Sequence, residues 1–147
     1  MKTIIKTCAV AIMVMFAATS QAQDKVITFE QLPQAAQNFI KKHFDAQKVS
    51  YIKEDSNFMS GNDYEVKFND GKKVEFDSKG NWTEVDMDKS AIPAGIVPEN
   101  IIAHVNKAFP NNSIVQIEKS SRKYEVELSN GLDLHFNSKG EFVRIDD

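Results

Sequence analysis

The sequence contains an internal repeat: residues 64–86 are similar to residues 124–146, at a constant spacing of 60 positions. Nine of the 23 aligned pairs are identical: Tyr64/Tyr124, Glu65/Glu125, Val66/Val126, Gly71/Gly131, Phe76/Phe136, Ser78/Ser138, Lys79/Lys139, Gly80/Gly140 and Asp86/Asp146. Within each copy, apolar and polar residues alternate in three segments, separated by a glycine-containing turn and then by Ser-Lys-Gly. Such alternation between glycine turns is typical of antiparallel strands joined by hairpins. The repeat therefore predicts a three-stranded β-meander that occurs twice.

A segment with helical spacing precedes each copy. After a short lead at residues 23–28, Leu32-Pro33 begins the first segment, and Val97-Pro98 begins the second 65 positions later. Proline is well suited to the first turn of a helix. Apolar residues then recur at helical spacing, namely Ala36, Phe39, Ile40 and Phe44 in the first segment and Ile101, Val105 and Phe109 in the second. We expect two amphipathic helices, the first ending near residue 45, and a further strand after each, at residues 49–54 and 113–119.

These patterns predict an α+β protein of two tandem repeats, each with one helix followed by a four-stranded antiparallel meander. The repeats would span residues 23–90 and 91–147, and a polar connection at 55–63 would belong to the first alone. Alternation leaves one face of each sheet apolar, so the helices should cover that face. A unit of about 60 residues buries little surface by itself, which favours packing of the two copies together.

Residues 1–22 have the pattern of a secretory signal peptide. Lys2 and Lys6 flank the start of an apolar run at residues 8–18, and Ser20-Gln21-Ala22 has the small-x-small form of a cleavage site. We expect cleavage near Ala22 and a periplasmic or secreted mature chain without a membrane span, because no later apolar stretch is long enough. Cys8 is the only cysteine and would leave with the leader, so neither disulfides nor zinc thiolate sites are expected.

Charge and motifs argue against several classes of function. Without Lys2 and Lys6 the chain carries 16 basic and 21 acidic residues, a net charge of −5, which disfavours nucleic acid as a partner. The histidines His43, His104 and His135 are far apart and lack a second ligand at a helical or hairpin spacing. The acidic ends at 86–88 and 146–147 lack the pattern of a calcium loop, and the Ser-Lys-Gly turns lack the context of a nucleophile. We expect no catalytic residue, no metal site and no cofactor.

The leader, the Leu-Pro or Val-Pro helix starts and the duplicated Tyr-Glu-Val, Phe and Ser-Lys-Gly motifs resemble the PepSY-like secreted proteins of Bacteroides-type bacteria. The resemblance covers residues 26–147. That family is similar in fold to the β-lactamase inhibitor protein. It implies a helix and a four-stranded sheet, twice, with the sheets forming one curved surface. In the inhibitor protein the open sheet face and its loops hold an enzyme.

Candidate contact residues come from the strand ends and from the connection that only the first copy has. We expect Val85, Val143 and Ile145 in the core. Alternation then places Trp82 and Phe142 on the solvent-exposed face of the sheet. A bulge would instead make Trp82 a core residue. The apolar pair Phe58 and Met59 lies in the 55–63 connection, where it could bind a partner or fold back onto the domain. Trp82, Phe142, Phe58 and Met59 are the predicted contacts, and the charged residues Glu84 and Lys67 their rim.

Two functions fit these expectations. The first is a non-enzymatic module that binds a protein or peptide of the cell envelope on its open sheet face, either as a simple binding module or as an inhibitor. The second is a small-ligand carrier or envelope sensor with a pocket between helices and sheet. The sequence does not determine an oligomeric state.

Overall fold

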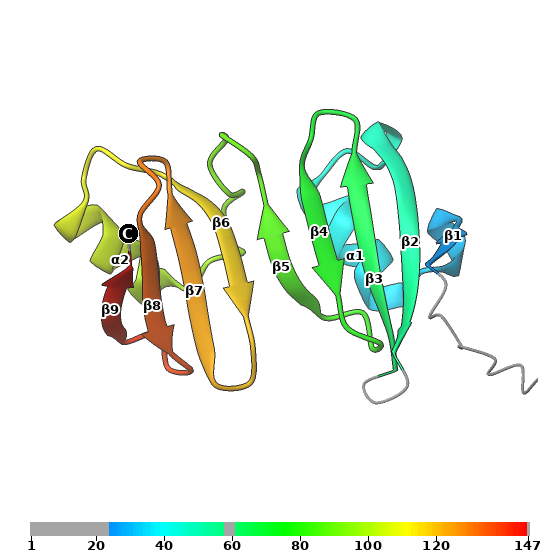
Figure 1. Cartoon of the computed structure of the whole chain (residues 1–147). Coiled ribbons are helices and arrows are strands. Elements are labelled where there is room, and N and C mark those ends of the chain that lie inside the picture. The colour runs from blue at the N-terminus through cyan, green and yellow to red at the C-terminus, as the bar shows by residue number, and fades with distance from the viewer. Residues whose placement is uncertain (1–23, 58–60, 147) are drawn as a thin grey trace, which may run out of the picture.

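The computed structural model describes residues 24–57 and 61–146. These residues form an α+β fold with two helices and one nine-stranded antiparallel sheet, in which every strand pairs with its neighbours in chain order (Figure 1). The strands are β1 (Lys25–Ile27), β2 (Val49–Asn57), β3 (Gly61–Phe68), β4 (Lys73–Phe76), β5 (Trp82–Asp86), β6 (Ile114–Lys119), β7 (Lys123–Leu128), β8 (Asp133–Asn137) and β9 (Phe142–Asp146).

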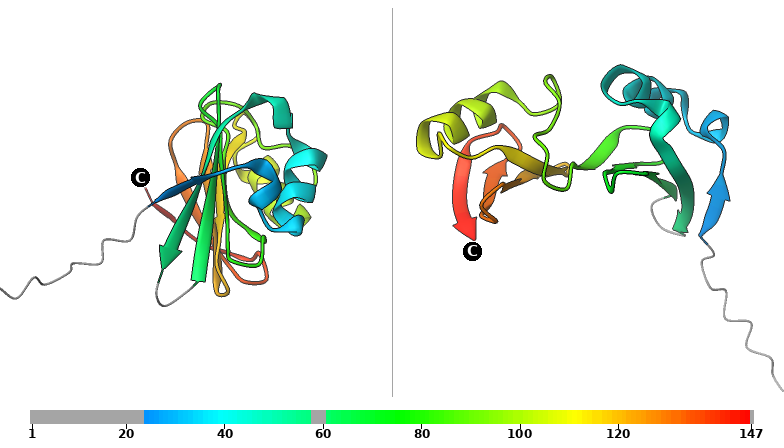
Figure 2. Two further views of the ribbon diagram at one scale, coloured as in Figure 1. Left: turned by 90° about the vertical axis from the view of Figure 1, so that its right-hand side faces the viewer. Right: turned by 90° about the horizontal axis from the view of Figure 1, so that it is seen from above.

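Both helices lie on the same side of the sheet (Figure 2). Helix α1 (Gln34–His43) precedes β2–β5, and α2 (Glu99–Ala108) precedes β6–β9. Each begins immediately after the expected proline, Pro33 or Pro98. Two short 3₁₀ turns, η1 (Phe29–Gln31) and η2 (Ala46–Lys48), flank α1. No helix in the described part of the chain is long and apolar enough to cross a membrane.

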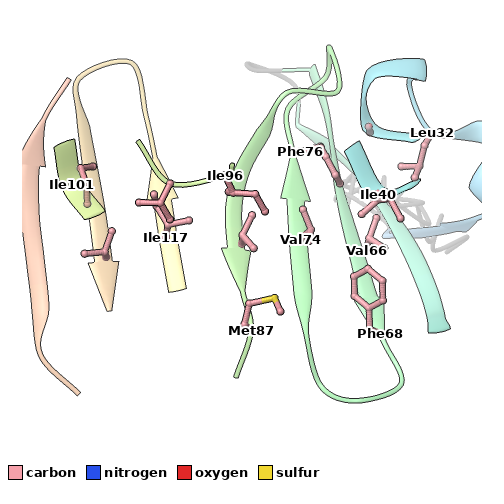
Figure 3. Packing of buried hydrophobic residues seen from close by; sticks show 14 of the residues in the cluster. Leu32, Ile40, Val66, Phe68, Val74, Phe76, Met87, Ile96, Ile101 and Ile117 are labelled. Carbon is pink, nitrogen blue, oxygen red and sulfur yellow. The ribbon is translucent and has the colours of Figure 1, made fainter. Parts of the chain in front are cut away.

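A single row of apolar residues crosses all nine strands on the helix-covered face. Successive register partners in this apolar row are Ile27, Ile52, Val66, Val74, Val85, Ile117, Val126, Leu134 and Ile145. All members are buried except Ile145. The helices bury Ile40 and Ile101 completely, and Ile40 lies close to Val66 (Figure 3). The row thus joins both halves in one core.

The repeated phenylalanines Phe76 and Phe136 are both buried, since each is 1% exposed. Phe76 meets Phe39 of α1 edge-on, with ring centroids 5.7 Å apart. Phe136 meets His104 of α2 in the same manner at 5.5 Å. Each helix therefore packs an aromatic or imidazole ring onto the third strand that follows it.

Two expectations about the first half are wrong. Residues 25–27 belong to the short lead to which no strand was assigned, but they form β1, because Ile27 pairs with Ile52 and is buried. The sheet is therefore larger than four strands per repeat. Most of the connection at 55–63 also belongs to strands, since β2 extends to Asn57 and β3 begins at Gly61. Antiparallel neighbours satisfy each other's backbone groups, so this hairpin continues through polar residues. Phe58 and Met59 lie outside the described residues.

The two halves share one continuous sheet through β5 and β6. Val85 pairs with Ile117, and both are completely buried. The neighbouring register partners are Glu84 with Glu118 and Asp86 with Gln116. The junction therefore has an apolar side, which belongs to the core, and a polar side.

Candidate functional site

The face of the sheet opposite the helices carries charged side chains from nearly every strand, and we call it the open face. Each strand contributes the residue next to its member of the apolar row, which points to the other side of the pleat. From β2 to β9, successive register partners are Lys53, Glu65, Glu75, Glu84, Glu118, Glu125, His135 and Arg144. Five consecutive strands thus present glutamate side by side, and we call Glu65, Glu75, Glu84, Glu118 and Glu125 the glutamate row.

Like charges directly opposite each other in a sheet are destabilising, and neighbouring residues partly compensate for them. The ammonium of Lys73 lies 2.9 Å from a carboxylate oxygen of Glu75 and 3.0 Å from one of Glu84. Burial acts to lower the pKa of Lys73, but these two contacts outweigh it and raise the pKa. The side-chain amide of Gln116 also donates to Glu84, at 2.9 Å.

The charged form of Glu84 is still disfavoured despite these partners. Burial raises its pKa above the ordinary value, and the carboxylates of Glu75 and Glu118 add to this, although Lys73 acts in the opposite direction. Two carboxylates that flank a third disfavour its charged form. A cation brought to this position would stabilise the charged form of Glu84.

At the β9 end the row is closed by a second group of charges. His135 is almost fully buried, with Nδ1 3.3 Å from Glu125 and Nε2 2.9 Å from Asp146. Arg144 pairs with the same Asp146 oxygen at 2.8 Å, and Lys123 pairs with Glu125 at 2.9 Å. His135 therefore lies between two carboxylates, one on each side of its ring.

Two hollows lie along the open face. The larger, about 400 Å³, lies over β2–β5 and is lined by Asp24, Lys53, Asp55, Asp63, Tyr64, Glu65, Glu75, Phe76 and Thr83. The smaller, about 170 Å³, is lined by Gln116 and four acids, Glu118, Glu125, Glu127 and Asp133. Both are rich in carboxylates, so the open face offers acceptors for hydrogen-bond donors and positive charge.

The predicted contact residues do not share one face. Glu84 and Lys67 do lie on the open face, where Glu84 belongs to the glutamate row and Lys67 is opposite Lys73. Trp82 and Phe142 were expected there, and this is wrong. Each pairs with a buried phenylalanine, Phe76 or Phe136, and so points toward the helices.

A β-bulge in each half explains the reversal. The register shifts between Glu75 and Phe76 in the first half and between His135 and Phe136 in the second. The extra residue opposite each shift changes the face of every side chain on one side of it. Trp82 as a core residue at a bulge, the alternative stated above, is the arrangement in the structure.

Trp82 and Phe142 differ in how well they are covered. Trp82 is partly buried, with its ring centroid 6.3 Å from that of Phe39 and the ammonium of Lys119 4.1 Å from the ring centroid. Phe142 stacks on His104 at 4.5 Å but remains 39% exposed. Val143 and Ile145 were expected in the core, yet they are 59% and 43% exposed. β9 lies at the edge of the nine described strands, so none of the other described strands covers its outer side.

The glutamate row itself was missed by sequence reasoning. Its local signal is present, because each of these glutamates adjoins a buried residue of the apolar row in the sequence. Placing the five side by side requires the register of every strand pair, including the β5–β6 junction. That register depends on bulges that the alternation pattern does not reveal.

Comparison with known proteins places this fold among putative periplasmic proteins of bacteria. A family model described as "Putative beta-lactamase-inhibitor-like, PepSY-like" matches residues 18–60 and 62–144. None of the curated proteins matches the chain significantly.

Three crystal structures of Bacteroides proteins are similar over most of their length. A putative periplasmic protein of the DUF2874 family from Bacteroides vulgatus is 41% identical, with 84% of this chain and 97% of that chain covered and a TM-score of 0.80. A putative calcium-regulated periplasmic protein from Bacteroides thetaiotaomicron is 44% identical, with the same coverage and TM-score. A second Bacteroides vulgatus protein, described as putative periplasmic and of unknown function, is 35% identical, with 85% and 100% covered and a TM-score of 0.79. These relatives assign the protein to the periplasm. The signal peptide itself stays a prediction, because residues 1–22 lie outside the described ranges.

Proposed function

Because the chain belongs to the β-lactamase-inhibitor-like, PepSY-like family, we propose that it is a periplasmic, non-enzymatic module that binds a protein or peptide on its open face. The observation that carries this proposal is the glutamate row, which crosses five consecutive strands. Opposed glutamates cost stability in a sheet. A surface that retains them despite that cost is understandable if the charges are used in recognition.

The charge of the open face selects the kind of partner. Register partners of the second polar row include Asp86, Glu127, Asp133 and Asp146, so acids predominate beyond the glutamate row as well. Complementary charge steers association and rejects partners of the same sign. We therefore expect a partner that presents lysine or arginine side chains to this face.

A calcium ion is a less suitable occupant of these carboxylates. Among residues 24–57 and 61–146, no three His, Cys, Asp or Glu side chains gather in an arrangement that could hold a metal ion. The glutamates are instead spread along a row, one per strand, with Lys73, Gln116 and Lys123 between them. This spacing suits several separate ammonium or guanidinium groups.

The test compares two double variants as baits for a periplasmic extract and for a panel of lysine-rich and arginine-rich peptides. Glu65→Gln with Glu118→Gln removes two charges from the glutamate row. Glu30→Gln with Glu99→Gln removes two exposed charges from the helix side and serves as the control. We expect the first pair to weaken binding by about tenfold at low salt and the control pair to leave it unchanged. Equal capture by both variants, or none by the parent chain, would contradict the proposal.

The same variant separates binding from folding. Replacing Glu118 removes a like charge opposite both Glu84 and Glu125, so the variant should be as stable as the parent or slightly more stable, by about 0.5 kcal/mol. Urea unfolding measures this. Loss of binding together with loss of stability would instead indicate a damaged fold.

A carrier of small ligands is the second candidate, and one groove favours it. The groove, about 220 Å³, lies between α2, the linker before it and the start of β6, and its apolar lining includes Ile92, Val97, Ile102, Val105 and Ile114. A panel of apolar metabolites should then raise the melting temperature of the parent chain but not that of Ile102→Lys. No shift with any compound would leave the groove without this role.

A further inference from the structure

Strand β9 is the least covered strand of the sheet. None of its five residues is buried, whereas every other strand buries at least one residue among those described. Three of its side chains, Phe142, Val143 and Ile145, are among the exposed large apolar residues. An edge strand with unpaired backbone groups and exposed apolar side chains is a template for pairing with another strand.

The first half shows what covers the equivalent strand. At the repeat spacing of 60, Ile145 corresponds to Val85 of β5. Both belong to the apolar row, but Val85 is completely buried because Ile117 of β6 lies opposite it. Ile145 is 43% exposed and has no such neighbour among the described strands. In the described sheet, every interior strand thus has a partner from the apolar row on both sides, and only the edge strands β1 and β9 lack one on their outer side.

A second copy of β9 would supply the missing neighbour in one particular register. If two β9 strands pair antiparallel about a two-fold axis through Ile145, that residue faces its own copy and the apolar row continues. The same register places Arg144 opposite Asp146 of the second copy, and Asp146 opposite its Arg144. Opposite charges across an antiparallel pair are stabilising. Both side chains are accessible for this contact, with 59% and 49% of their surface exposed.

The neighbouring symmetric register is unfavourable. A two-fold axis through Arg144 would pair Val143 with Ile145, but it would place two guanidinium groups opposite each other and Phe142 opposite a carboxylate of Asp146. Like charges in this position are destabilising. The register centred on Ile145 thus gives this residue an apolar partner and matches Arg144 with Asp146 in both directions.

We propose that the protein self-associates through its β9 edge, in the antiparallel register centred on Ile145. The interface is isologous, as expected of a two-fold dimer. It is also short, since β9 has five residues. Interfaces of this size are weak, so the dimer forms reversibly at high protein concentration. The open faces of two copies would then lie side by side on one extended sheet.

Charge reversal tests the register. Sedimentation velocity of the mature chain is followed from roughly 5 µM to roughly 500 µM, a range chosen for a weak interface. Arg144→Asp and Asp146→Arg should each weaken dimerisation by about tenfold, because two attractive contacts become repulsive. An equimolar mixture of the two variants should restore it, because the opposing charges match again. Arg122→Asp in the β6–β7 turn is the control and should change nothing.

A cysteine variant gives an independent result. The predicted mature chain has no cysteine, so Ile145→Cys introduces a single thiol. Directly opposite residues in an antiparallel pair have the Cα separation that a disulfide needs. Mild oxidation should therefore crosslink Ile145→Cys to a covalent dimer faster than Val26→Cys, a variant on the β1 edge at a more exposed position, 69% against 43%. A chain that stays monomeric throughout, a mixture that does not recover, or equal crosslinking at both edges would overturn the proposal.

Discussion

At the scale of single residues, two bulges decide which face the aromatic side chains of β5 and β9 occupy. Trp82 reads as a wet-face residue by alternation from Val85, but the shift between Glu75 and Phe76 moves it to the helix side. The ring of Phe39 lies near it there, and the ammonium of Lys119 lies over its ring. Burial lowers the pKa of Lys119. Trp82 thus contributes to packing, and a contact role on the open face would require the opposite orientation.

Trp82→Ala should therefore reduce the free energy of unfolding by about 2 kcal/mol, less than a fully buried aromatic because Trp82 is only partly covered. Phe76→Ala, which removes the fully buried register partner of Trp82, should cost about 3 to 5 kcal/mol. Urea unfolding followed by circular dichroism compares them. In the parent chain the emission of this sole tryptophan should be blue-shifted. An unchanged midpoint for Trp82→Ala, together with emission like that of free tryptophan, would show that Trp82 is exposed to solvent and would contradict its packing role.

At the scale of elements, the same turn is built in both halves with a different residue at its key position. Oδ1 of Asp77 accepts from the backbone of Lys79 and Asn81, both at 2.9 Å. Oδ1 of Asn137 accepts from the backbone of Lys139 and Glu141, both at 3.0 Å. Only the first of these turns has a titratable side chain at this accepting position. Burial acts to raise the pKa of Asp77, but the hydrogen bonds from Asn81 and Lys79 outweigh it, so the pKa lies below the ordinary value.

This difference predicts a pH effect that belongs to one turn. A carboxyl group with a lowered pKa in the folded state stabilises the protein above its unfolded pKa, and this stability is lost as the pH falls through the folded value. Asp77→Asn should therefore reduce the loss of stability on acidification, while changing little at pH 7, because Asn137 supports the same turn. Asn137→Asp should increase the acid loss. Thermal melts from neutral pH to about pH 3 measure both, since the ordinary pKa of Asp lies in that range. Identical acid profiles for all three chains would contradict this account of the turn.

At the scale of the whole molecule, the repeat predicted the helices, the later strands and the side on which the core lies. It could not predict β1, because three residues are too few for an alternation signal and Ile27 is buried only through its pairing with Ile52. The contact set of Trp82 and Phe142 failed for a related reason, since bulges leave no mark in the pattern of apolar residues. The glutamate row depends on cross-strand register over the entire sheet. The periodicity of the sequence therefore predicts most of the helices and strands, whereas the candidate site depends on the register between the strands.

The continuous sheet also implies that the two halves unfold together. Val85 of β5 and Ile117 of β6 are opposite each other and completely buried at the junction, so neither half keeps its core without the other. Ile117→Ala should cost about 2 to 5 kcal/mol. Because Trp82 lies in the first half and Ile117 in the second, tryptophan fluorescence reports the effect across the junction. We expect the fluorescence and circular dichroism midpoints to fall together, as in a two-state transition. A fluorescence midpoint that stays in place while the dichroism midpoint falls would mean that the halves are independent folding units, joined by a sheet contact that contributes little to either.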